Sequence, residues 1–291
     1  MDVQKAHRPV VVGVDGSKAA ERAVRWAALE ARRRHVPVRV VQAVGWVPPL
    51  YRYTDRALGP DARVELVRAA QDDVAAAAEV AATAAPGVVV EQEVLDGFPV
   101  PRLLDETATA QLVVVGDRGR GGVAGLLLGS VAVTLAAQGA CPVVVVRGIE
   151  PPEGPVVLGI DGSPVSEPAL AAAFEAAAAR AVPLVAVYAW RDLLFDPGIT
   201  VHDWALVEQQ ARAELAERLA GWSGKYPDVP VRRVVVRDAP ARALVEQSAT
   251  AQLLVVGSHG RGEVEALLLG SVSHAVLHRS HCPVMIVRAG R

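Results

Sequence analysis

Short runs of consecutive apolar residues, many of them β-branched, alternate along this chain with longer segments of helical periodicity. Such runs, bounded by turn residues, are typical of strands buried on both faces of a sheet. In the first half the predicted strands are 10–14, 38–44, 87–95, 112–115 and 142–147, and the predicted helices are 19–34, 61–85, 99–110 and 128–138. Asp15-Gly16-Ser17 ends the first strand and supplies a cap for the helix that follows.

The second half of the chain repeats this order. Its predicted strands are 156–160, 183–188, 231–236, 253–256 and 283–287, and Asp161-Gly162-Ser163 repeats the cap. Between the halves, residues 148–155 hold three prolines and two glycines, which predicts a linker. We therefore expect two domains, 1–148 and 149–291.

Strands that alternate with helices form parallel sheets through right-handed crossovers, which indicates an α/β fold. In open sheets of this kind, ligands bind beyond the carboxyl ends of the strands. Asp15, Ala43, Asp96 and Gly116 follow or end the predicted strands. We expect them to lie along the edge that binds a ligand.

The most specific motif is a glycine signature that occurs once in each half. Gly116-Asp117-Arg118-Gly119 is followed after nine residues by Gly129-Ser130, and Gly257-Ser258-His259-Gly260 is followed after nine residues by Gly270-Ser271. The second copy begins 141 residues after the first (257 − 116). Each copy follows an apolar run and opens a predicted helix, whose free N–H groups favour a bound phosphate.

The residue types within the signature agree with phosphate binding. Glycines permit positive φ and remove the Cβ where an anion must touch backbone N–H groups. Ser130 and Ser271 can donate their hydroxyls, and Arg118, Arg120, His259 and Arg261 can offset phosphate charge. A single glycine pair would more often be a turn, but the duplicated spacing and the strand–loop–helix context favour a phosphate site in each half.

Asp15 and Asp161 admit two interpretations, an Asx turn that caps a helix or a contact with nucleotide at the strand end. The two roles can coexist, and we favour the contact. Cys141 and Cys282 each precede a proline at the start of a valine-rich strand. They are predicted to be small core residues rather than reactive thiols.

Composition excludes several classes of partner. The 291 residues carry a net charge of −2, which favours neither nucleic acid nor an anionic membrane as a partner. The longest apolar runs are far shorter than a membrane span, and no signal peptide is recognised. With two cysteines at equivalent repeat positions, these features predict a cytoplasmic protein.

The strand ends Val-Gly-Val-Asp15-Gly-Ser and Leu-Gly-Ile-Asp161-Gly-Ser, the two glycine signatures and the terminal Cys-Pro-Val strands resemble a tandem universal stress protein of the ATP-binding, actinobacterial type. The resemblance covers essentially the whole chain. It implies two flavodoxin-like (Rossmann-like) domains, each a five-stranded parallel sheet of order 3-2-1-4-5 with helices on both faces. It also implies that the fifth strands, 142–147 and 283–288, pair within one chain as a pseudo-dimer, and a further homodimer is an open alternative.

The same resemblance implies one ATP, with Mg²⁺, in each domain. Adenine then maps to Gly13, Asp15, Ala43, Gly159, Asp161 and Val187. Phosphates map to Gly116, Asp117, Arg118, Gly119, Arg120, Gly121, Gly122, Gly129, Ser130 and Val131, and to Gly257, Ser258, His259, Gly260, Arg261, Gly262, Gly270, Ser271, Val272 and Ser273. One departure is Asp117, where a hydroxyl residue is common. Its carboxylate should weaken phosphate binding unless it points away or helps hold Mg²⁺.

The leading hypothesis is a nucleotide-dependent sensor of the stress response that acts through an unknown protein partner. No catalytic residue is predicted, because the chain has no Walker A lysine motif and no compact base–metal constellation near the glycines. Slow hydrolysis by a phosphotransferase or ATPase and a nucleotide-free interaction scaffold are the alternatives.

Overall fold

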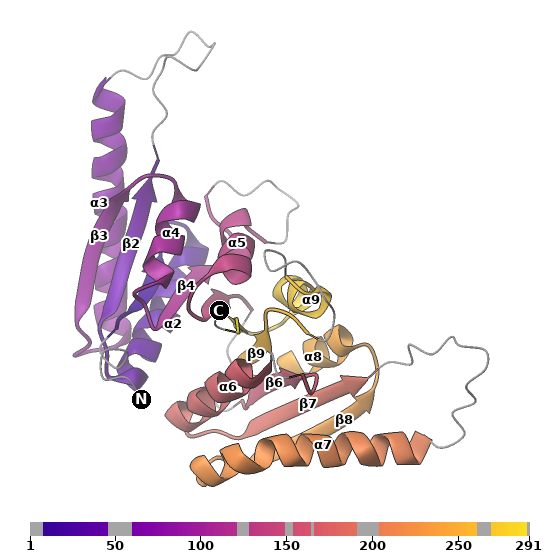
Figure 1. Ribbon diagram of the computed structural model, residues 1–291. Helices are drawn as coiled ribbons and strands as arrows, with labels where there is room; N and C mark the ends of the chain where they lie inside the picture. The colour runs from indigo at the N-terminus through magenta and orange to yellow at the C-terminus, as the bar shows by residue number, and fades with distance from the viewer. Residues whose placement is uncertain are drawn as a thin grey trace, which may run out of the picture. The chain divides into compact units, whose positions relative to one another are not determined.

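The computed structural model describes residues 8–45, 60–120, 128–148, 154–163, 166–190, 204–260 and 269–289, with the side chains of 60–61, 190 and 204–207 outside the description. The chain divides into two compact units, Met1–Val146 and Arg147–Arg291. Each is a parallel sheet covered by helices (Figure 1).

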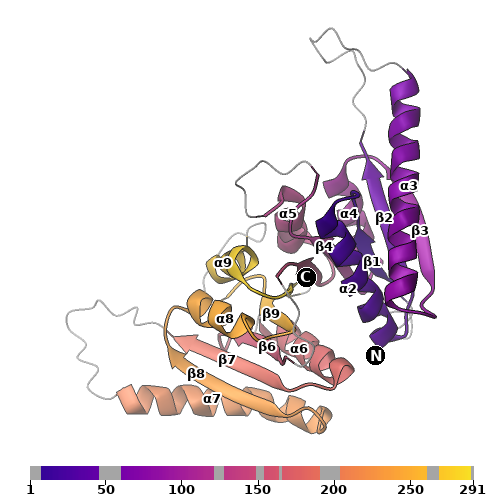
Figure 2. The same cartoon turned by 180° about the vertical axis from the view of Figure 1, so that it is seen from behind.

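In the first unit, five strands form the order β3-β2-β1-β4-β5, and every neighbouring pair is parallel. The strands are β1 (Val10–Gly13), β2 (Val38–Val44), β3 (Val90–Asp96), β4 (Leu112–Gly116) and β5 (Val143–Val146). The helices are α2 (Lys18–Arg34), α3 (Pro60–Ala84), α4 (Pro99–Thr107) and α5 (Ser130–Gln138). Helices α2 and α3 pack together on one face of the sheet, and α4 and α5 pack together on the other (Figure 2).

The second unit repeats this topology with the order β8-β7-β6-β9-β10. Its strands are β6 (Val156–Ile160), β7 (Leu184–Trp190), β8 (Val231–Arg237), β9 (Leu253–Gly257) and β10 (Val284–Val287). Its helices are α6 (Glu167–Arg180), α7 (Trp204–Lys225), α8 (Pro240–Ser248) and α9 (Ser271–Arg279). The predicted fold class, with order 3-2-1-4-5 in each half and helices on both faces, is confirmed.

The two helix caps after the first strands differ, although their sequences match. The Ser17 hydroxyl accepts a hydrogen bond from the Ala20 N–H at 3.1 Å and caps α2, as predicted. In the second unit the Ser163 hydroxyl instead donates to the Asp161 carboxylate at 2.7 Å. That hydroxyl does not cap a helix, and α6 begins only at Glu167. The prediction of a repeated cap is therefore wrong for the second unit.

The core is built from apolar strands and alanine-rich helix faces. Val10, Val11 and Val12 of β1 are fully buried because helices cover both faces of the central strand. Small side chains let helix and strand backbones approach closely. At Gly116, an added Cβ would lie 2.8 Å from the carbonyl carbon of Ala19, so glycine is required there by the packing of α2 against β4. None of the described helices is long and apolar enough to cross a membrane.

The two cysteines contribute to this packing. Cys282 is fully buried, and burial raises the pKa of the Cys141 thiol to about 12. A thiol with so high a pKa holds almost no thiolate at neutral pH, and the thiolate is the reactive form. Cys282 is therefore a core residue, as predicted, whereas Cys141 is half-buried, and its raised pKa agrees with the prediction that it is not a reactive thiol.

Two glycine substitutions are expected to change stability in opposite directions. Gly116→Ala should lower the free energy of unfolding by about 1–3 kcal/mol, because its Cβ overpacks against the α2 backbone. Gly221→Ala, inside α7 with no atom within 4 Å of the new Cβ, should raise it by about 0.5–1 kcal/mol through helix propensity. Urea denaturation followed by circular dichroism measures both. A Gly116→Ala variant as stable as the wild type would contradict the packing argument.

Candidate functional site

A cavity of about 450 Å³ opens at the carboxyl edge of the first unit's sheet. The ends of β1, β2 and β4, the glycine loop and the first turns of α4 and α5 all contribute to its wall. The lining residues are Gly13, Val14, Asp15, Ala20, Val41, Gln42, Ala43, Pro99, Leu103, Val115, Gly116, Arg118, Gly119, Leu128, Gly129, Ser130, Val131 and Ala132. The position agrees with the general rule that parallel sheets bind ligands where their strands end.

Most of the residues predicted for the first site meet at this cavity. Those that line it are Gly13, Asp15, Ala43, Gly116, Arg118, Gly119, Gly129, Ser130 and Val131. Asp117 and Arg120 do not line it, and their side chains are engaged elsewhere. Gly121 and Gly122 lie outside the described residues, as do Arg261 and Gly262 of the second signature.

The Asp15 carboxylate joins the first strand to the glycine loop. One oxygen accepts the Ser17 N–H at 3.1 Å, which closes an Asx turn, and the other accepts the Arg120 N–H at 2.6 Å. Bonds from N–H groups to a charged acceptor are stronger than neutral ones. The carboxylate therefore fixes the backbone of the loop relative to β1, and the Asx-turn interpretation of Asp15 holds together with its place in the cavity wall.

The second glycine of each signature lies against the carboxylate of the aspartate that ends the first strand of its own unit. A Cβ at Gly119 would collide with Asp15 Oδ2, and a Cβ at Gly260 would lie 2.8 Å from Asp161 Oδ2. The positive φ expected at the loop glycines occurs instead one residue after each aspartate, at Gly16 (φ 73°) and Gly162 (φ 78°). None of the described signature glycines has a positive φ. Gly116, Gly119 and Gly260 are required by close contacts rather than by left-handed backbone, whereas a Cβ at Gly129 would come no closer than 3.7 Å to another residue.

Asp117 does not line the cavity. It is buried and pairs with Arg22 of α2, with Nη2–Oδ1 at 3.1 Å, while Arg118 Nε lies 3.8 Å from its other oxygen. The equivalent positions 141 and 146 residues later are Ser258 and Pro168, so the aspartate and its arginine partner occur together in one unit. The pair removes the repulsion that the sequence alone had suggested for phosphate.

The two arginines of the first loop have different environments. Arg118 lines the cavity with a side chain that is 59% exposed. The Arg120 guanidinium instead contacts Asp73 of α3, with Nη1–Oδ2 at 3.0 Å and Nη2–Oδ1 at 3.4 Å. Gln42, which also lines the cavity, donates to the same carboxylate at 3.3 Å. Of these two arginines, Arg118 is the one placed to offset charge inside the cavity.

The first turn of α5 supplies backbone donors to the cavity. Gly129 precedes the helix, and its own N–H is used, because it donates to the Asp117 carbonyl at 2.8 Å. Ser130, Val131 and Ala132 follow at the first three helical positions, whose N–H groups have no acceptor within the helix. A glycine at the cap has no side chain to satisfy them, so they favour an anion together with the helix dipole.

The apolar part of the wall was not anticipated from the sequence. Val41, Val115, Pro99 and Leu103 come from two strands and from α4. Gly13 lies beneath this wall, where an added Cβ would be 3.1 Å from both terminal carbons of Leu103. Leu103 is one apolar position of an amphipathic helix, and only the packing of α4 against β1 and β2 shows that it borders a cavity.

In the second unit the described part of the site is similar at the backbone. Asp161 accepts the Ser163 N–H at 2.9 Å, and the Gly270 N–H donates to the Ser258 carbonyl at 2.9 Å. Ser271 and Val272 occupy the first turn of α9, as Ser130 and Val131 do in α5.

Three residues predicted for the second site, Ser273, Ser258 and Val187, have contacts or register positions that the sequence did not predict. Ser273 is buried and donates its hydroxyl to the Gly257 carbonyl at 2.6 Å, so this hydroxyl does not face a phosphate. The Ser258 hydroxyl lies 3.0 Å from Nδ1 of His259. Val187 pairs in register with Gly159 just as Val41 pairs with Gly13, so the counterpart of Ala43 is Ala189.

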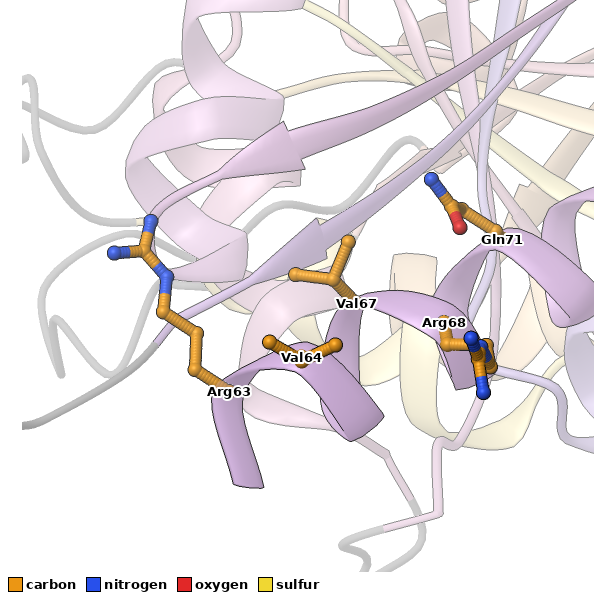
Figure 3. A pocket seen from close by; sticks show the side chains of 5 residues that line it. All are labelled: Arg63, Val64, Val67, Arg68 and Gln71. Carbon is orange, nitrogen blue, oxygen red and sulfur yellow. The ribbon is translucent and has the colours of Figure 1, made fainter. Parts of the chain in front are cut away.

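A second hollow, of about 310 Å³, is formed by Arg63, Val64, Val67, Arg68 and Gln71. Figure 3 shows that all five side chains come from one helix, α3. A hollow with a single helix as its wall brings no groups from other elements together. Of these two hollows in the described residues, the cavity at the strand ends brings groups from several elements together, so that cavity is the candidate site of the first unit.

Comparison with known proteins agrees with this architecture. The family model described as the universal stress protein family matches the chain twice, at residues 6–147 and 154–288. The universal stress protein Rv2005c of Mycobacterium tuberculosis is 44% identical over 300 aligned positions, which cover 99% of each chain. This chain belongs to the universal stress protein family.

Solved structures of universal stress proteins include one from Archaeoglobus fulgidus that has the same fold. It has a TM-score of 0.72 and 18% identity, and the match covers 97% of this chain and 98% of that one. A shorter universal stress protein, solved in complex with cAMP, is 30% identical with a TM-score of 0.37, and the match covers 49% of this chain and 98% of that one.

The contact between Asp15 and the loop is testable by hydrogen exchange. Asp15→Ala should raise the exchange rate of the Arg120 amide by about tenfold or more, because the lost bond is to a charged acceptor. Amide exchange followed by mass spectrometry over residues 116–120 measures it. Asp161→Ala is the matched control, which should leave this segment of the first unit unchanged. Equal exchange in the wild type and Asp15→Ala would contradict the contact.

Proposed function

We propose that this universal stress protein binds ATP at one site in each unit and acts in the cytoplasm as a nucleotide-dependent sensor. The observation that carries the proposal is the mixed lining of the first unit's cavity. The lining combines the open first turn of α5 and Arg118 with apolar side chains such as Val41, Pro99 and Leu103. A polyphosphate suits the first set of groups and a nucleobase suits the second.

The charges around the cavity support an anionic ligand. Asp117 is paired with Arg22, and both oxygens of Asp15 already accept backbone N–H groups, so two nearby carboxylates are compensated. Arg118 adds a cation at the wall. Within the described residues no group of three or more His, Cys, Asp or Glu side chains could hold a metal ion. Mg²⁺ in this proposal therefore arrives with the triphosphate oxygens of the nucleotide.

The proposal assigns binding rather than turnover to the site. Among the described residues that line the cavity, only Asp15 and Arg118 carry ionisable side chains. Asp15 is held by two N–H groups, and an arginine does not give up its proton. A site of this kind acts as a sensor when occupancy changes the affinity of the protein for a partner or for another conformation.

Analysis of the purified protein tests the proposal. Nucleotide released on denaturation is identified by chromatography, and ATP binding is measured by calorimetry. An empty protein that does not bind added ATP would favour a nucleotide-free scaffold. Loss of the γ-phosphate within seconds in a single-turnover assay would favour an ATPase or phosphotransferase.

The two arginines of the first loop provide a sharper test. Arg118→Ala should weaken ATP binding to the first unit by about tenfold, because it removes a charge-assisted contact with phosphate. Arg120→Ala should change it by less than about threefold, because that guanidinium is occupied by Asp73 and the backbone N–H to Asp15 remains. Calorimetric titration measures both variants. Equal losses for the two variants would contradict the assignment.

A further inference from the structure

An exposed aromatic residue lies next to the lining of the first cavity without being part of it. Phe98 immediately precedes α4 and is 54% exposed, although it is large and apolar. The next residue, Pro99, lines the cavity, and so does Leu103 one turn further along α4. A single exposed apolar side chain is ordinary on a protein surface. The location of Phe98 beside the cavity is what distinguishes it.

The strand opposite fixes where the ring lies. Val41 and Ala43 are alternate residues of β2 and point to the same face of the sheet, and Gly45 follows the last residue of that strand, Val44. Val41 and Ala43 line the cavity, as does Gln42 between them. At Gly45 an added Cβ would lie 2.5 Å from Cδ1 and 2.9 Å from Cγ of Phe98, so the ring rests directly on the glycine backbone.

Two residues advance a strand by about 7 Å, which places the ring next to the wall formed by Ala43. The ring therefore lies beside the wall formed by Val41 and Ala43, next to the start of α4. Gly45 and Phe98 form a matched pair, because any larger residue at 45 would displace the ring. We propose that Phe98 is a specificity-determining residue that stacks against the nucleobase in the first unit.

The second unit lacks this feature. Its residue at the same place before α8 is Ala239, although Pro240 and Leu244 repeat the other apolar residues of α4. The two sites are therefore unequal beside these helices, and the first binds the nucleoside part of its ligand more tightly. This inference rests on the proposed function, since it requires that a nucleotide occupies the cavity.

Calorimetric titration of the full chain with ATP and with inorganic tripolyphosphate tests the inference. Phe98→Ala should weaken one of the two ATP binding constants by about tenfold, the effect of losing a base–aromatic stack, and leave the other within about twofold. Binding of tripolyphosphate, which has no base, should be unchanged. The matched control is Val89→Ala, which truncates an equally exposed apolar residue, 63% exposed, next to the amino end of β3.

The outcomes separate this inference from the proposed function. A Phe98→Ala variant with wild-type ATP affinity would overturn the role of the ring. If Phe98→Ala weakened the binding of ATP and of tripolyphosphate equally, the role of the ring would also be overturned, since this result would show a general disturbance of the loop. A wild-type protein that binds neither probe would overturn the proposed function itself. Phe98→Leu, which keeps an apolar side chain of similar length but no ring, should behave like Phe98→Ala.

Discussion

The contact on which this architecture depends is the one between a strand-end carboxylate and the glycine loop. Asp15 holds its own Asx turn with one oxygen and the Arg120 N–H with the other. Residues 116–120 of the loop are therefore held in place relative to β1. Gly119 lies close to Asp15, and Gly260 lies close to Asp161. The glycine signature and the Asp-Gly-Ser turn are therefore packed against each other, although about 100 residues separate them (119 − 15 and 260 − 161).

Electrostatics follow from the same arrangement. A buried carboxylate beside a phosphate site would oppose binding, but Asp117 is paired with Arg22 on α2. Arg120 is paired with Asp73 on α3, and among the described lining residues Arg118 is the cation on the cavity wall. Each of these partners lies on a helix that is distant in sequence from the loop. The charge presented to a ligand is therefore set by helix packing rather than by loop composition.

The duplication makes the differences between the units informative. The first unit has Arg22 with Asp117, and Phe98 before α4, whereas the second has Pro168, Ser258 and Ala239 at the corresponding positions. The backbone elements around the second site are repeated, since Gly270 donates to Ser258 as Gly129 does to Asp117. The scaffold is thus repeated in the two halves, while these side chains next to the cavity differ.

The sequence by itself determined the α/β class, the ten strands and the location of a glycine-rich site at the strand ends, because buried parallel strands are continuous apolar runs and glycines mark close approaches. It could not show which atom each glycine approaches. Gly116 meets Ala19, Gly13 meets Leu103, and Gly119 meets Asp15, all of them contacts between elements far apart in the chain. Only the tertiary structure decided these roles, since they depend on how helices pack across the sheet and not on local sequence.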